Sequence, residues 1–164
     1  MISKKMAEAI NGQMNKEFYS AYLYLSMSAW SQAKHLRGFA HWFALQAREE
    51  AGHAMKFCRY LEDQGATVRL PAIDAPTATF ASPLAVFETT LKHEQFVTQS
   101  IGQLMDQAVS EKDHATQIML QWFVSEQVEE EASASEVVEK LKLLGDDPRG
   151  LYLVDRELAG RAAK

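Results

Sequence analysis

The chain has 164 residues, enough for one domain with a sizeable apolar core, and 47% of them are hydrophobic. Its formal net charge of −5 argues against a polyanion such as a nucleic acid as a partner and favours the attraction of cations. The one cysteine, Cys58, excludes a disulfide framework within the chain and a thiolate metal cluster. No signal peptide and no apolar run of ~20 residues is visible, so we expect a cytoplasmic protein without a membrane partner.

The first half of the sequence predicts two long helices followed by a long connection. Apolar residues recur at helical spacing over about residues 3–33, a short turn covers 34–37, and a second helix reaches about Gln64. Gly65 is suited to the position that follows a helix end. The segment 66–81 has no sustained period, which predicts a crossover and not a tight hairpin.

The second half predicts two more long helices and a short fifth one. Ser82, as an N-cap before a proline, starts a helix over about residues 83–111. Asp113 caps a helix that reaches Leu144, and an Asp-Pro pair opens a short helix over about 148–158. The sequence therefore predicts a single all-α domain, residues 1–164. It is a four-helix bundle with a long crossover between the second and third helices and a short C-terminal fifth helix.

Each of the four long helices carries an acidic residue inside its apolar face. At 100° per residue, the positions concerned are Glu17, Glu50, Glu94 and Glu130, with Glu126 beside the last. A buried carboxylate is very costly unless it is paired or coordinates a metal. One such acid could point along its helix axis or pair with a buried arginine, but no arginine or lysine lies near the centres of these faces. Two divalent ions would neutralise the four charges, so the pattern predicts a dinuclear metal site.

The types of the candidate ligand residues narrow the choice of metal ion. His53 follows Glu50 by three residues and adds one imidazole to an oxygen-rich set of ligands. This set disfavours structural zinc and type-1 copper, and it suits iron or manganese better than magnesium or calcium. The remaining histidines are expected to be solvated or to cap helices: His35, His41, His93 and His114.

Several segments together resemble those of bacterial non-haem ferritins over essentially the whole chain. They are residues 15–23 (Asn-Lys-Glu-Phe-Tyr-Ser-Ala-Tyr-Leu), 49–54 (Glu-Glu-Ala-Gly-His-Ala), Glu94-Gln95, residues 120–131 (Leu-Gln-Trp-Phe-Val-Ser-Glu-Gln-Val-Glu-Glu-Glu) and Gly150-Leu151-Tyr152. Glu-x-x-His alone would be a weak signal, whereas the combination is specific. The resemblance implies the ferritin-like bundle and an iron function.

The resemblance also implies roles for individual residues. Glu17, Glu50 and His53 would bind one iron ion, and Glu94 and Glu130 the second, with Glu50 bridging. Glu49, Glu126 and Glu129 would join Glu130 in a nearby third site, and Gln127 completes the set of candidate metal ligands.

Two aromatic residues lie near this predicted centre. Tyr24 resembles the family tyrosine beside the diiron centre and is a candidate electron donor. On sequence alone it is equally well a core tyrosine with a hydrogen-bonded hydroxyl. Trp122 is similarly placed, and there we expect packing only.

Departures from related families exclude other members of the same fold. Bacterioferritins carry a second Glu-x-x-His, which the last long helix lacks, and Gly52 stands where their haem-ligating methionine would lie, so no haem is expected. The fifth helix and the absence of a basic tail separate the chain from DNA-protecting mini-ferritins. One cysteine cannot build the four-cysteine unit of rubrerythrins.

A second apolar band on the first helix predicts self-association. Tyr19, Leu23, Met27 and Trp30 lie away from Glu17, so this helix is expected to need a second burial partner, interpreted as a neighbouring subunit. The resemblance implies a hollow shell of 24 subunits with the fifth helix lining an axis.

The sequence therefore predicts an iron-storage ferritin with ferroxidase activity, which oxidises Fe²⁺ with O₂ or H₂O₂ and stores Fe³⁺ as a mineral. The alternative is a non-storing diiron peroxidase or oxidase of the same fold. A metal-free helical scaffold is a third interpretation, against which the buried acids argue.

Overall fold

The computed structural model describes residues 2–163, and these contain helices and no strand. The helices are α1 (Lys4–Ala33), α2 (Arg37–Asp63), α3 (Pro83–Ser110), α4 (His114–Leu144) and α5 (Pro148–Ala159). The predicted all-α bundle with a short fifth helix is confirmed, and the helix boundaries lie within about one residue of those expected from the sequence.

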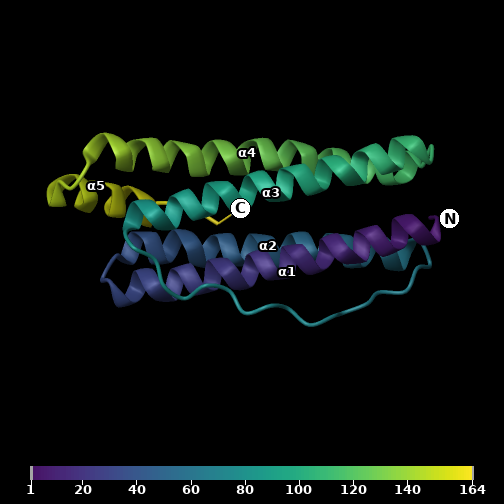
Figure 1. Cartoon of the computed structure of the whole chain (residues 1–164), viewed down its shortest axis with the longest axis horizontal. Coiled ribbons are helices and arrows are strands. Elements are labelled where there is room, and N and C mark those ends of the chain that lie inside the picture. The colour runs from purple at the N-terminus through teal and green to yellow at the C-terminus, as the bar shows by residue number, and fades with distance from the viewer. Residues whose placement is uncertain (1, 164) are drawn as a thin grey trace.

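Two antiparallel helix pairs form the bundle. Figure 1 shows α1 beside α2 and α3 beside α4, with α5 at the end where α4 finishes. The connection between α2 and α3 runs along the length of the bundle, so α3 points in the same direction as α2 (Figure 1). Asn11 ties this connection to α1, because its side-chain amide donates to the Thr67 carbonyl (3.0 Å) and its Oδ1 accepts from the Arg69 N–H (2.6 Å).

Four helices begin at a capping side chain of their own. The side-chain oxygen of each cap accepts a hydrogen bond from a backbone N–H two or three residues later, which satisfies one of the free donors at a helix start. The caps are Ser3, Ser82, Asp113 and Asp147.

Helix α2 receives its cap from a distant part of the chain. Its own N-cap residue, Leu36, makes no side-chain bond. Instead, Asp155 on α5 accepts from the backbone N–H of Gly38 (2.8 Å) and of Phe39 (3.1 Å). A Cβ atom at position 38 would lie 1.6 Å from the Asp155 carbonyl oxygen, so only glycine permits this approach. The start of α2 therefore fixes where α5 lies.

The apolar core consists of two clusters. The first is built around Tyr24, Phe39, Phe43 and Phe87 and includes Val154 and Leu158 of α5. The second is built around Met6, Ile10, Phe57, Ile101 and Phe123. Each long helix carries one buried acid at a chain position between those of the two clusters: Glu17, Glu50, Glu94 and Glu130.

The expectation that the second apolar band of α1 faces a neighbouring subunit is wrong. Leu23 and Met27 are buried in the first cluster, and Tyr19 and Trp30 pack against it. The reason is that α1 contacts both α2 and α3, so two sides of the helix are covered within one chain. Exposed apolar side chains lie on another face instead, and include Tyr22, Leu25 and Ile73.

Among residues 2–163, no helix is both long enough and apolar enough to cross a membrane.

Candidate metal centre

Four carboxylates, one from each long helix, are buried in the interior of the bundle. The exposed fraction is 1% for Glu17, 2% for Glu50, 1% for Glu94 and 3% for Glu130. Each acid therefore faces inward, as its place in the apolar face predicts. His53 accompanies them from α2 and is 5% exposed.

Burial and mutual repulsion raise the pKa values of three of these acids, Glu17, Glu50 and Glu94. Removal from water raises the pKa of Glu17 well above its usual value, and the negative charge of Glu50 adds to this. The pKa of Glu50 is raised in the same way by burial and then by Glu94 and Glu130. Burial also raises the pKa of Glu94, against the opposing effect of its hydrogen bonds. We call the four buried acids Glu17, Glu50, Glu94 and Glu130 the carboxylate layer. Without a cation, this layer therefore favours protonated acids, and a bound cation would displace the protons.

Neutral amide groups of three glutamines donate hydrogen bonds to all four carboxylates. The Gln13 amide donates to Glu17 Oε1 (2.7 Å), and the Gln127 amide donates to Glu94 Oε2 (3.2 Å). The Gln46 amide donates to Glu130 Oε2 (2.5 Å) and, more weakly, to Glu50 Oε1 (3.4 Å). These donors orient the acids without adding positive charge, so the layer keeps its attraction for cations.

Gln13 and Gln46 were not singled out from the sequence. A signal exists, because each glutamine stands four residues before an acid of the apolar face, Gln13 before Glu17 and Gln46 before Glu50. Residues four apart on a helix are neighbours on the same face, so each amide can reach its acid.

Among residues 2–163, two groups of three side chains have ligand atoms close enough together to hold a metal ion. One ligand atom each from Glu17, Glu50 and His53 lie within 4.8 Å of one another, and the same holds for His53, Glu126 and Glu130. In the first group, His53 Nδ1 lies 3.3 Å from Glu50 Oε2. Carboxylate oxygens and an imidazole nitrogen are suitable ligands for iron or manganese.

The other predicted ligands are placed differently. Glu94 belongs to neither group, but its negative charge raises the pKa of Glu50, so it lies in the same layer. Glu129 is exposed. Glu49 also belongs to neither group; its Oε2 forms an ion pair with Arg161 Nη2 at 2.7 Å. The structure thus brings Glu126 close to His53 and Glu130 and pairs Glu49 with the segment after α5.

Tyr24 is fully buried beside the carboxylates. Its hydroxyl donates a hydrogen bond to Glu94 Oε1, and its ring stacks against Phe43 at a centroid distance of 6.2 Å. Burial and the negative charge of Glu94 raise the pKa of Tyr24 well above its usual value, so the phenol keeps its proton.

The expectation that His93 is solvated or caps a helix is wrong. The other three histidines outside the centre are exposed, as expected. His93 is partly buried; its Nε2 lies 2.7 Å from Ser20 Oγ, and its ring contacts those of Tyr19 and Tyr24. Burial lowers the pKa of His93 to about 4, so the ring is neutral. The helical phase placed it off the centre of the α3 face, but α1 covers that side as well. The exposed histidines are His35, His41 and His114.

Trp122 packs as expected, although it also borders the centre. The centroid of its ring lies 5.3 Å from that of His53, and the Lys56 ammonium lies over the Trp122 ring, 2.8 Å from a ring centroid. The indole is 39% exposed, so it forms part of the wall between His53 and solvent.

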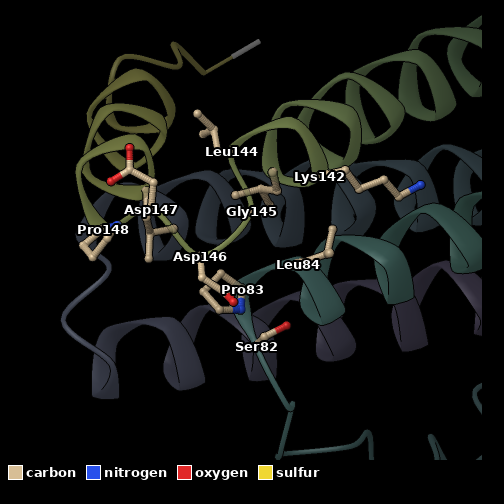
Figure 2. Close-up of a pocket in the computed structure, with 11 residues that line it drawn as sticks. Ser82, Pro83, Leu84, Lys142, Leu144, Gly145, Asp146, Asp147 and Pro148 are labelled. Atoms are coloured by element: carbon tan, nitrogen blue, oxygen red, sulfur yellow. The ribbon is translucent and has the colours of Figure 1, made fainter.

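A separate cavity of about 420 Å³ lies at the junction of α4 and α5. Figure 2 shows Leu84 and Pro83 from the start of α3 facing Leu144 and Pro148 across it. Its Asp147 carboxylate is already used to cap α5. The cavity is mainly apolar and contains none of the buried acids, so it is not part of the metal centre.

Comparisons with known proteins agree with this architecture. A family model described as Ferritin-like domain matches residues 7–144. Bacterial non-heme ferritin from Campylobacter jejuni is 44% identical over 156 residues, which cover 95% of this chain and 93% of that protein. Bacterial non-heme ferritin from Staphylococcus aureus is 41% identical over 161 residues, covering 98% of this chain and 97% of that protein.

Solved structures match equally well. One described as a novel open pore ferritin from the hyperthermophilic archaeon Archaeoglobus fulgidus has a TM-score of 0.98 and 49% identity, covering 99% of this chain and 100% of that chain. A closed form of the same ferritin, engineered by site-directed mutagenesis, has a TM-score of 0.98 and 48% identity, with full coverage of both chains. Because the family model spans most of the sequence and these relatives match it nearly from end to end, the chain belongs to the ferritin family.

Proposed function

We propose that this protein is an iron-storage ferritin that oxidises Fe²⁺ at a dinuclear centre within each subunit. The observation that carries the proposal is the buried group of Glu17, Glu50 and His53, with a second group sharing His53 and adding Glu130. Acids held together in an apolar interior are costly as they stand, and two divalent ions would relieve that cost.

In this proposal, Glu17, Glu50 and His53 bind one Fe²⁺ ion, and Glu94 and Glu130 bind the second, with Glu50 between them. The Gln127 amide nitrogen donates to Glu94, which leaves its amide oxygen for a metal ion. Protons leave the raised-pKa acids as the ions bind, so that negative charge replaces hydration around the iron.

The proposed reaction is the oxidation of two Fe²⁺ ions by one molecule of O₂ or H₂O₂. Two Fe²⁺ ions give up two electrons, and O₂ takes up both with two protons to give H₂O₂. With H₂O₂ as oxidant, two Fe²⁺ ions and two protons give two Fe³⁺ ions and two molecules of water. The protein contributes fixed positions and negative charge, and the redox change belongs to the iron.

A third, weaker iron site is proposed on the side of Glu130. Glu126 contributes to it directly, since its ligand atom lies within 4.8 Å of those of His53 and Glu130. Glu129 and Glu49 complete the site in this proposal. Tyr24 is proposed to supply an electron during oxidation, since its hydroxyl already bonds to a ligand, Glu94.

Storage requires a closed assembly, and we propose self-association into a 24-subunit shell. Support comes from a shallow groove on the α1–α2 face, lined by Phe18, Tyr22, Leu25, Ala47 and Ile73. Tyr22 is 49% and Leu25 54% exposed, although both are apolar. An apolar surface of this kind is typical of a contact between protein subunits.

One experiment separates storage from a non-storing diiron oxidase. The metal-free protein is loaded with an excess of Fe²⁺ in air, and its mass and iron content are measured by light scattering and metal analysis. We expect a particle of several hundred kilodaltons that retains far more iron than three ions per subunit. A small oligomer that retains only two or three ions per subunit would favour the oxidase and contradict storage.

The site assignment is tested with ligand variants. Glu17→Ala and His53→Ala should each slow the fast phase of Fe²⁺ oxidation by at least about 100-fold, because each removes a ligand. Glu8→Ala is the matched control, since Glu8 is an exposed acid on the same helix as Glu17. Stopped-flow absorbance measures the rates, and wild-type rates in both ligand variants would contradict the assignment.

A further inference from the structure

The segment that follows α5 places one arginine beside the buried acids. Arg161 comes 112 residues after Glu49, and its guanidinium donates to Glu49 Oε2 at 2.7 Å. It also donates to Gln46 Oε1 at 2.8 Å and lies over the Trp42 ring, 4.5 Å from the centroid. The Arg161 side chain is only 18% exposed and that of Glu49 only 12%. Arg161 is thus held on the α2 face by several contacts from a single stretch of that helix.

The contacts of Arg161 continue to the centre itself. Gln46 accepts from Arg161 with its amide oxygen, so its amide nitrogen must point the other way, where it donates to Glu130. Gln46 is fully buried, so this orientation has no competition from solvent. Arg161 is therefore two hydrogen bonds from a predicted iron ligand.

Glu49 is only half satisfied by this arrangement. Its Oε2 bonds to Arg161, but its Oε1 is buried and has no hydrogen-bond partner among the described residues. A buried carboxylate oxygen without a donor is costly, and a cation would satisfy it. In the conformation that Arg161 holds, Glu49 belongs to neither of the two groups whose ligand atoms lie within 4.8 Å of one another, so it joins the centre only by turning away from Arg161.

We propose that Arg161 competes with a metal ion for Glu49, so that the third iron site fills only when the segment after α5 releases this carboxylate. The inference rests on the proposed function of the buried acids. Arg161 acts here as a positioning residue, because it reaches the metal only through Glu49 and Gln46. A fixed positive charge at this place repels an arriving cation and occupies one oxygen of its ligand, so the third ion binds more weakly than the first two.

Competition of this kind has a reciprocal consequence. If Arg161 weakens the binding of the third ion by some factor, the third ion must weaken the docking of Arg161 by the same factor. The backbone N–H of Arg161 bonds to the Leu158 carbonyl at 3.2 Å, and the His41 ring bonds to the Arg161 carbonyl. Exchange of the amide hydrogens in this segment therefore reports its release. Figure 1 shows the segment, in yellow, leaving α5 and running back along the bundle.

The test uses anaerobic calorimetric titration of the assembled, metal-free protein with Zn²⁺, which undergoes no redox change. Wild type is compared with Arg161→Gln and with Arg156→Gln, an arginine of α5 that is exposed and serves as the matched control. We expect Arg161→Gln to bind the third ion on the order of tenfold more tightly, with a much smaller change in the affinity for the first two ions. Arg156→Gln should match wild type. Arg161→Lys, which keeps the charge but loses the forked geometry, should lie between wild type and Arg161→Gln.

A second pair of variants attributes the effect to Glu49. In a Glu49→Gln background, adding Arg161→Gln should leave the affinity for the third ion unchanged, because the carboxylate under competition is gone. Hydrogen exchange at residues 159–162 should speed up on Zn²⁺ saturation in wild type by a factor similar to the change in affinity.

Three outcomes would overturn the inference. The first is an equal or weaker third affinity in Arg161→Gln, the second is an undiminished effect in the Glu49→Gln background, and the third is hydrogen exchange that does not respond to Zn²⁺. Failure of wild type to bind the first two ions would instead contradict the dinuclear centre on which the inference rests.

Discussion

The two apolar clusters and the carboxylate layer between them follow opposite physical rules. In the clusters, Phe57 stacks on Phe123 at 4.0 Å between centroids, and burial of such rings stabilises the fold in any state. In the layer, Glu17 and Glu50 are as deeply buried, but their raised pKa values show that burial there opposes the charged state. The clusters therefore determine the fold, whereas burial of the charged acids costs stability, which a bound cation would recover.

The largest expected change in the free energy of unfolding comes from a substitution in an apolar cluster. Phe57→Ala should lower the free energy of unfolding by about 3–5 kcal/mol, because it leaves a cavity opposite Phe123 in a closely packed region. The effect should be the same with and without bound metal, since no carboxylate is involved. Chemical denaturation of both forms measures it. A loss below about 1 kcal/mol would mean that this end of the bundle is not the stabilising core.

The layer should respond in the opposite direction. Glu50→Gln should raise the free energy of unfolding of the metal-free protein by about 1–4 kcal/mol near neutral pH, because it removes a charge that burial and two neighbouring acids disfavour. The same variant should bind the first two Zn²⁺ ions more weakly than wild type. Destabilisation of the metal-free protein by Glu50→Gln would contradict the description of the layer as a region that costs stability.

The pH dependence of stability provides a second test of whether burial of these acids destabilises the metal-free protein. A carboxyl group whose folded pKa is raised contributes stability that is fully present below its unfolded pKa of about 4.5 and is lost as the pH rises through the folded pKa. The metal-free protein should therefore become less stable from about pH 4.5 upward, and Glu50→Gln should reduce this slope. Bound Zn²⁺ should reduce it too, because the ion displaces the protons.

The smallest expected effect is at the border between the two regions. Tyr24→Phe keeps the ring in the first cluster and removes only the hydroxyl that bonds to Glu94, so stability should change by about 1 kcal/mol or less. Later steps of iron oxidation should change, whereas binding of the first two ions should not. Stopped-flow traces that overlay those of wild type at limiting iron would make Tyr24 a core residue only.

Local patterns in the sequence were sufficient to predict where the helices begin and end and which acids face inward. Ser3, Ser82, Asp113 and Asp147 give clear helix starts, and the spacing of 3.6 residues shows which face each acid occupies. These signals lie within one helix, so they do not depend on knowing its neighbours.

Contacts between distant parts of the chain could not be predicted in this way. The Asp155 cap of α2 and the Arg161–Glu49 pair join residues more than a hundred positions apart, and nothing local marks either one. The burial of His93 and of the Leu23–Met27 band was missed for a related reason. Helical phase shows which side of a helix a residue occupies, but not which neighbour covers that side.

The use of neutral amides beside the acids has a consequence for how easily the proposed metal binding could be lost. Gln13 and Gln46 can donate to a carboxyl group whether it is protonated, ionised or bound to metal. Their hydrogen bonds can therefore persist before and after a cation binds. A lysine in place of either would neutralise one of the four buried acids and so weaken the attraction of these acids for a cation. A single substitution at a residue that is not itself a ligand would then weaken the proposed metal site while leaving the apolar clusters of the bundle unchanged.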